Sequence, residues 1–148
     1  QNRQLWNRDL ISRGHAYLVS AASGEELSDY HLEAAIAVCH AFAPSFEQTN
    51  WHQILSLYEL LSNIKPGPIV DLNKAIVTGY VESAQRGIEE LNKIEGLERH
   101  YLYHAALGDF YLQMSDKPQA RSCYEQALPL TNSNQEKQLI EQKMRLCE

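Results

Sequence analysis

Cysteine is scarce in this chain, and its placement excludes two kinds of site. The 148 residues contain three cysteines, Cys39, Cys123 and Cys147. None belongs to a C-x-x-C pair, and an odd number of cysteines cannot form a complete set of disulfides. Cys39 and Cys123 fall on apolar helical faces, where a free cysteine behaves as a small hydrophobic residue. This usage predicts a protein of the reducing cytoplasm.

Long apolar runs and basic charge are also lacking. No apolar run approaches the ~18 residues that a membrane-spanning helix needs. There are 13 Lys and Arg residues against 19 Asp and Glu residues, a net charge of -6. That balance opposes nonspecific binding to nucleic acid, which requires cations to neutralise phosphates. Because 44% of the residues are apolar, we expect a globular cytoplasmic protein that contacts neither membranes nor nucleic acid directly.

Motifs for catalysis or for holding a cofactor are missing too. The sequence has no Gly-rich phosphate loop and no G-x-S-x-G elbow. His100 and His104 share a helix face at the i, i+4 spacing of a metal pair, but no third ligand accompanies them. The adjacent Cys39 and His40 point about 100° apart on a helix, so they do not form a nucleophile and its base. We therefore predict no enzyme activity, no cofactor and no metal; a helical hydrolase would instead need titratable groups converging around the two histidines.

What the sequence does have is helical periodicity from end to end. Strand-like alternation is absent, and Gly, Pro, Ser and Asn residues fall between the periodic stretches. The pattern predicts about eight helices, with Ser28, Thr49 or Asn50, Ser83 and Ser133 as N-caps. Their expected ranges are about 4–22, 29–43, 51–65, 68–79, 84–96, 98–114, 117–128 and 134–148.

The sixth and seventh of these helices carry the most specific pattern. Leu107-Gly108, Tyr111, Ala120, Tyr124 and Ala127 have the residue types and spacing of a tetratricopeptide (TPR) repeat, which spans about 34 residues. The small residues Gly108 and Ala120 allow two antiparallel helices to approach closely, and the two tyrosines fill the space beside them. Such a pair is a packing module and favours a binding function over catalysis.

Weaker copies of this pattern precede it. Tyr58, Leu61 and Pro66 keep the spacing of the TPR aromatic, small and Pro positions, although Leu61 is larger than expected. We therefore predict an all-α fold, a right-handed array of antiparallel helix pairs resembling a TPR solenoid. It forms a single domain over residues 1–148, with N-terminal helices and a degenerate pair in 1–66. TPR-like pairs and a C-terminal capping helix follow in 67–148, since a solenoid requires a polar cap.

A second pattern overlies these repeats along nearly the whole chain. It consists of Leu5-Trp6-Asn7-Arg8-Asp9-Leu10-Ile11, Tyr30-His31-Leu32-Glu33-Ala34-Ala35-Ile36-Ala37, Ala43-Pro44-Ser45, Thr49-Asn50-Trp51, Gln53-Ile54, Leu57-Tyr58, Pro68-Ile69-Val70, Leu72-Asn73-Lys74-Ala75 and the run from Gly108 to Ala127. In this order and spacing, the set resembles the TPR-like C-terminal extension of bacterial sigma-70-type, extracytoplasmic-function RNA polymerase sigma factors.

The resemblance implies a regulatory extension rather than a DNA-binding part. In such factors, two N-terminal helical domains bind polymerase and promoter DNA, and neither is visible in this sequence. We interpret the chain, which begins at Gln1 within a helix-like pattern, as part of a longer polypeptide. The implied partners are the N-terminal sigma domains of that polypeptide and the RNA polymerase core or a regulatory protein. The alternative is a stand-alone TPR scaffold that binds a peptide of an unrelated partner.

Seven residues are candidates for contacts with a protein partner. The first helix would pack against preceding sequence, so it offers Trp6 and Arg8 (with Arg3 beside them), and aromatic and arginine residues are favoured at interfaces. The second helix offers Tyr30, Glu33 and His40, and the fourth offers Asn73 and Lys74. The resemblance implies that the first helix of each pair lines the concave side, where Asn73 could bind the backbone of a peptide. For each candidate a purely structural role stays open.

Overall fold

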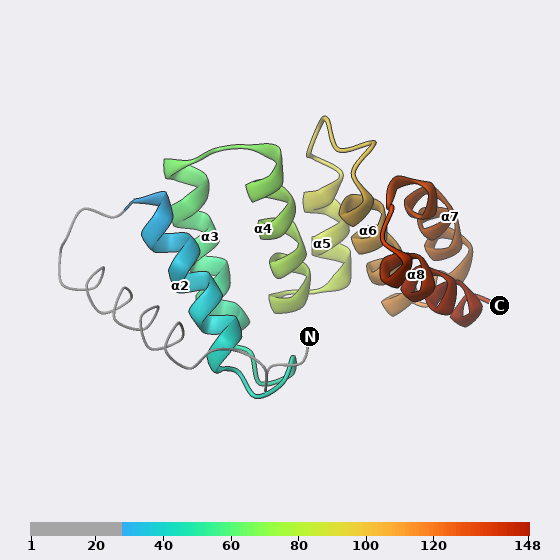
Figure 1. Cartoon of the computed structure of the whole chain (residues 1–148), viewed down its shortest axis with the longest axis horizontal. Coiled ribbons are helices and arrows are strands. Elements are labelled where there is room, and N and C mark those ends of the chain that lie inside the picture. Colours follow the sequence, from blue (N-terminus) through green and yellow to red (C-terminus); the bar gives the residue numbers. More distant parts are fainter. Residues whose placement is uncertain (1–27) are drawn as a thin grey trace. The chain divides into compact units, whose positions relative to one another are not determined.

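The computed structural model describes residues 28–148, and every regular element in that range is helical. Seven α-helices follow one another, and a short 3-10 helix, η2, separates the last two (Figure 1). They are α2 (Asp29–Phe42), α3 (Trp51–Ile64), α4 (Pro68–Val81), α5 (Ala84–Leu91), α6 (Tyr101–Gln113), α7 (Lys117–Ala127), η2 (Leu128–Leu130) and α8 (Asn134–Leu146). The prediction of an all-α protein is confirmed for this range, which contains no β-strand. The helix expected at 4–22 lies outside the described residues.

The chain divides into two compact units, Gln1–Val70 and Asp71–Glu148. We call them the N-terminal and the C-terminal unit and describe each by itself. The predicted single domain, with its parts at 1–66 and 67–148, stays a prediction. None of the helices within residues 28–148 is long and apolar enough to cross a membrane.

Side-chain caps fix where five of the helices begin. Ser28, Asn50, Ser83, Asp116 and Ser133 each accept a hydrogen bond from the backbone N–H three residues further on. This bond satisfies one of the four backbone donors that a helix leaves without a partner at its start, and it contributes about 1 kcal/mol. The caps expected from the sequence are confirmed, with Asn50 in place rather than Thr49.

Two helix boundaries differ from the prediction. The fifth helix ends at Leu91 and does not continue to Gly96. Gly96 has a φ of 84°, a left-handed conformation that a helix cannot contain. The sixth helix begins at Tyr101 instead of about Glu98, and the backbone oxygen of Glu98 lies 2.8 Å from Nε2 of the buried His104. The loop therefore satisfies a buried side chain that a longer helix would have left without this partner.

The N-terminal unit has a core between α2 and α3. Leu32, Ala35, Ile36 and Cys39 are buried positions of α2 that recur at helical spacing. Ile54 and Leu61 are buried on α3. Leu61, which is larger than the small residue of a TPR pair, is 3% exposed and serves as core.

The core of the C-terminal unit depends on glycines that let aromatic rings approach the helix backbone. A Cβ atom built on Gly79 of α4 would lie 2.1 Å from the ring of Phe110, and one on Gly87 of α5 would lie 2.6 Å from it. A Cβ atom on Gly108 of α6 would lie 2.5 Å from the ring of Tyr124 on α7. Tyr124 and Ala120 are fully buried, so the predicted close approach of α6 and α7 is confirmed.

Candidate functional site: charged surfaces of the two units

The seven residues selected from the sequence fall into three groups. Trp6 and Arg8, with the neighbouring Arg3, lie outside the described residues. Three candidates lie on α2 of the N-terminal unit, namely Tyr30, Glu33 and His40. The remaining two, Asn73 and Lys74, lie on α4 in the C-terminal unit.

Glu33 connects the start of α2 to the end of α3. Its carboxylate accepts a hydrogen bond from Nζ of Lys65 at 3.0 Å, and the same ammonium lies 3.7 Å from Asp29. The pKa of Lys65 is raised, first by its hydrogen bond to Glu33 and then by the charge of that carboxylate. The pKa of Tyr58 is also raised, first by burial and then by the charge of Glu33. Glu33 therefore has a structural role within its own unit, and its carboxylate is about half exposed.

Tyr30 and His40 have different surroundings. Tyr30 is 65% exposed, which makes it the most accessible of the candidates in the described part of the chain. The ring of His40 packs edge-on against Trp51, with 5.4 Å between the ring centroids. The ring centroids of Trp51 and Phe46 lie 4.8 Å apart. The indole Nε1 of Trp51 donates a hydrogen bond to the backbone oxygen of Phe46 at 3.1 Å. His40 thus belongs to an aromatic cluster where α2 meets the start of α3.

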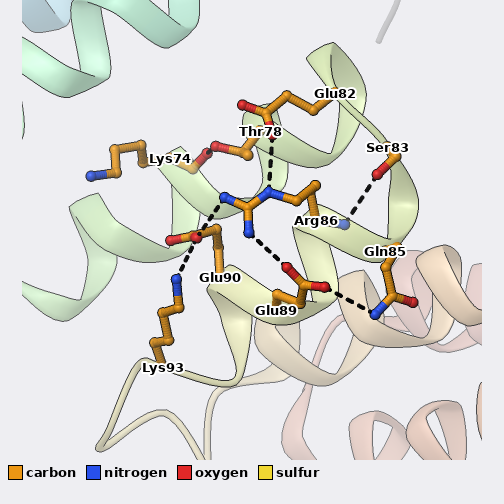
Figure 2. Close-up of polar contacts among 9 residues, drawn as sticks. All are labelled: Lys74, Thr78, Glu82, Ser83, Gln85, Arg86, Glu89, Glu90 and Lys93. Carbon is orange, nitrogen blue, oxygen red and sulfur yellow. Dashed lines mark hydrogen bonds and ion pairs between the residues drawn. The ribbon is translucent and has the colours of Figure 1, made fainter.

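Lys74 lies beside a charged network on α5. Figure 2 shows that the guanidinium of Arg86 lies at the centre of this network. Its Nε, Nη1 and Nη2 atoms lie 3.1, 2.6 and 3.2 Å from carboxylate oxygens of Glu82, Glu89 and Glu90, respectively. Glu89 and Glu90 follow Arg86 by three and four positions, the spacing of neighbours on the surface of α5, whereas Glu82 lies in the turn before that helix.

Positively charged side chains from both α4 and α5 act on the carboxylate of Glu90. Lys93 donates a hydrogen bond to its carboxylate at 2.6 Å. The pKa of Glu90 is lowered, first by that bond and then by the charges of Lys93, Arg86 and Lys74. Lys74 extends from α4, so its charge favours the approach of α4 and the eight-residue helix α5. An incoming anion would have to displace carboxylates from Arg86, so the network suits a structural role better than anion binding.

A second polar centre joins α6, α7 and α8. The hydroxyl of Tyr124 donates to Oδ1 of Asp109 at 2.7 Å. Nζ of Lys143 donates to both oxygens of the same carboxylate, at 2.7 and 2.8 Å. The pKa of Tyr124 is raised, first by burial and then by its hydrogen bond to Asp109. The ion pair of Asp109 and Lys143 is only partly exposed. It connects α8 to the pair formed by α6 and α7.

The histidines and cysteines of the described range do not gather into a metal-binding group. Among residues 28–148, no group of three or more His, Cys, Asp and Glu side chains is placed to hold a metal ion. Burial raises the pKa of the thiols of Cys39 and Cys123. At neutral pH both thiols therefore stay protonated, which disfavours nucleophilic attack.

Sequence reasoning missed the residues at the centres of both networks, Arg86, Asp109 and Lys143. A signal was present for Arg86, because glutamates flank it at the spacings of helical ion pairs. A weaker signal existed for the second pair. Asp109 and Lys143 lie 34 positions apart, which is the length of one TPR repeat.

Comparison with known proteins gives one informative match. No protein-family model matches this sequence, and no solved structure matches it. An uncharacterized protein of Rhizobium meliloti (strain 1021) is 30% identical over 145 residues, which cover 97% of this chain. The chain spans about a third of the length of that relative, of which 34% is covered.

Proposed function

We propose that this chain is a regulatory protein-protein interaction domain of a bacterial RNA polymerase sigma factor, acting in the cytoplasm on transcription initiation. The domain is a right-handed TPR-like array of helix pairs with a capping helix and has no catalytic or DNA-binding activity of its own. The observation that carries the proposal is the ordered set of motifs that resembles the extension of such factors. The glycine-mediated contact of α6 with α7 supports the TPR-like part, as does the 34-residue interval between Asp109 and Lys143.

The relative from Rhizobium meliloti supports this proposal through its length. It matches nearly all of this chain, yet the match accounts for 34% of its own residues. The remainder of that protein is long enough for further domains, as a sigma factor with an extension requires. In such an arrangement the N-terminal sigma domains are partners within one polypeptide, and the polymerase core or a regulatory protein is the partner outside it.

Among the predicted contact residues that the structure describes, Tyr30 supports the proposal best. It is large, aromatic and 65% exposed, and tyrosine is enriched at energetically important interface positions. Glu33 and Lys74 participate in charged contacts within their own units. Their substitution would therefore change contacts within the units as well as binding, and we choose Tyr30 for the test because its aromatic ring is the most exposed of the described candidates.

The experiment is a binding assay followed by a transcription assay. The 148-residue chain is mixed with purified sigma domains of its longer polypeptide and, separately, with core RNA polymerase. We expect it to bind at least one of them, and we expect deletion of the chain from the factor to change promoter-specific transcription. Tyr30→Ala should weaken binding by about 10-fold. The matched control is Phe42→Ala, since Phe42 lies on the same helix and is 57% exposed.

The first result that would contradict the proposal is the absence of binding to both partners together with unchanged transcription after deletion. A second result, an equal effect of the Tyr30 and Phe42 substitutions, would contradict only the placement of Tyr30 at the interface. A stand-alone TPR scaffold, which the α6–α7 pair also suits, predicts the first result together with binding to a peptide of an unrelated protein.

A further inference from the structure

Three polar side chains of α2 that meet α3 point in one direction. Asp29 and Glu33 lie 3.7 and 3.0 Å from Nζ of Lys65, just after the end of α3. The ring of His40 packs against Trp51, the first residue of α3. At 100° per residue, these three side chains of α2 lie within about 40° of one another around the helix axis. α3, which runs beside α2 in Figure 1, therefore covers this side of α2.

The opposite side of α2 is covered as well. Val38 points about 160° away from the middle of the three contacts with α3, yet its side chain is only 6% exposed. Ala34 and Ala41 point within about 60° of Val38 and are partly buried. One neighbouring surface covers an apolar stripe of about 100° on a helix. The burial of Val38 therefore requires a second segment besides α3.

Within the N-terminal unit, the described residues outside the two helices approach α2 from the α3 side. The connection at 43–50 includes Phe46, whose ring packs on Trp51 and so lies near His40. The residues at 65–70 begin with Lys65, which pairs with Glu33. Both contacts lie far around the helix from Val38. The unit starts at Gln1, so the segment left to cover Val38 within it is the one before Ser28.

The sequence of that segment suits the task. A helix is predicted at about 4–22, outside the described residues. On such a helix Trp6, Leu10 and Tyr17 would point within about 40° of one another and form an apolar stripe. Residues 23–28 would connect it to α2, and connections of about 2–8 residues are usual between neighbouring helices of a bundle. So short a tether gives the segment an effective concentration on the order of millimolar, which favours it over a separate partner.

An antiparallel arrangement matches large residues with small ones. With the ends of the two helices level, Tyr17 lies opposite Ala34 and Leu10 lies opposite Ala41. Val38 then fits between the two large side chains. Alanine at the facing positions lets the two helix axes come close, because interaxial distances follow the size of the side chains at the contact.

We infer that residues 4–22 form a helix that packs antiparallel on the Val38 side of α2, with Leu10 and Tyr17 on either side of Val38. This contact goes beyond the proposed function and does not depend on it. It also decides which side of the segment a partner can reach. Arg8 and Ser12 point about 160° away from Leu10, so they face outward, whereas Leu10 and Tyr17 are covered by α2.

The test is a double-mutant cycle in the 148-residue chain. Val38→Ala and Tyr17→Ala are made singly and together, and thermal unfolding is followed by circular dichroism at 222 nm. Each single substitution should lower the Tm by about 2–8 °C, because it removes buried apolar atoms. In the chain that already lacks the Tyr17 ring, Val38→Ala should lower the Tm by less than about half as much, because the shared contact is gone.

Two control substitutions locate the contact. Val77→Ala is the matched control for Val38, since Val77 is a valine with 4% exposure on α4 of the C-terminal unit. Its effect on the Tm should be the same with and without the Tyr17 ring. Ser12→Ala changes the outward side of the segment and should leave the effect of Val38→Ala unchanged.

Hydrogen exchange followed by mass spectrometry gives a second measurement, which needs no cooperative unfolding transition. The double variant L10A/Y17A should exchange the backbone amides of α2 about 10-fold faster than the original chain, because local opening becomes easier once the covering helix is lost. Exchange in α6 of the C-terminal unit should stay unchanged and serves as the internal reference.

Four outcomes would overturn the inference. One is an effect of Val38→Ala that is equal with and without the Tyr17 ring, and another is unchanged exchange of α2 in L10A/Y17A. A third is coupling of Tyr17 to Val77 as strong as its coupling to Val38. The fourth is a dimer, detected by light scattering, that Val38→Ala dissociates, because this result would assign the Val38 side of α2 to a second copy of the chain.

Discussion

Replacement of Gly108 by alanine tests the packing of α6 against α7. The new Cβ atom would lie 2.5 Å from Cε1 of Tyr124 and 2.7 Å from its Cδ1. Tyr124 is fully buried, and its hydroxyl is held by Asp109 at 2.7 Å, so the ring cannot move away without losing that bond. Overpacking of this kind costs about 1–3 kcal/mol.

An opposing effect must be subtracted from this cost. Alanine is favoured over glycine inside a helix by about 1 kcal/mol. The net change in the free energy of unfolding is therefore a loss of up to about 2 kcal/mol. For a chain of 148 residues, this corresponds to a decrease in Tm of up to about 8 °C. Thermal and urea unfolding followed by circular dichroism at 222 nm measure both quantities.

Two further variants show whether the ring causes the loss. In a chain with Tyr124→Leu, which removes the ring, Gly108→Ala should no longer destabilise and should gain part of the helix preference. Gly67→Ala is the control for glycine replacement as such, because nothing lies within 4 Å of a Cβ atom built there. A Gly108→Ala variant more stable than the original chain would refute the reasoning. An equal loss with and without the Tyr124 ring would refute it as well.

The second polar centre and the cysteines give three more predictions. Asp109→Asn should lower the free energy of unfolding by about 1–3 kcal/mol in urea titrations, because Lys143 loses a charged, partly buried partner; a neutral effect would contradict this. Above about pH 10, unfolded tyrosines ionise, whereas Tyr124, with its raised pKa, keeps its proton when folded. Since the folded state then binds more protons, stability should fall as pH rises from there, and Tyr124→Phe should reduce that slope; an unchanged slope would exclude the tyrosine. Finally, Ellman's reagent at pH 8 should label the half-buried Cys147 first; faster reaction of the other two cysteines would contradict their burial.

The sequence predicted the helices well because their ends are set locally. Ser28, Ser83 and Ser133 cap the helices that they were expected to cap, since a short oxygen-bearing side chain before an apolar periodic stretch has few alternatives. The end of α5 was missed, because Ile94 continues the apolar spacing beyond Leu91. After Leu91 the tertiary contacts outweigh this local pattern. The chain leaves the helix and forms the loop in which the backbone oxygen of Glu98 meets His104.

The candidate surfaces could be predicted only in part. The contacts of Arg86 are local and could have been derived from helical spacing. The contact of Lys143 with Asp109 had only the weak signal of a 34-residue interval, because tertiary structure alone brings residues that far apart together. Exposure is likewise a tertiary property: Ile140 is fully buried while its neighbour Leu139 is 46% exposed. No count of apolar residues along α8 distinguishes those two side chains.

The ring of Phe110 restricts how this sequence can change over generations. A methyl group at Gly79 or at Gly87 would collide with that ring, and a Cβ atom on Gly87 would also lie 2.9 Å from the backbone of Gly79. Neither glycine can acquire a side chain first without loss of stability. Substitutions at these sites therefore have an order, in which a smaller residue at 110 precedes any gain of bulk at 79, while a side chain at 87 also requires the backbone at 79 to move. In homologous chains, we expect the three positions to vary jointly rather than one by one.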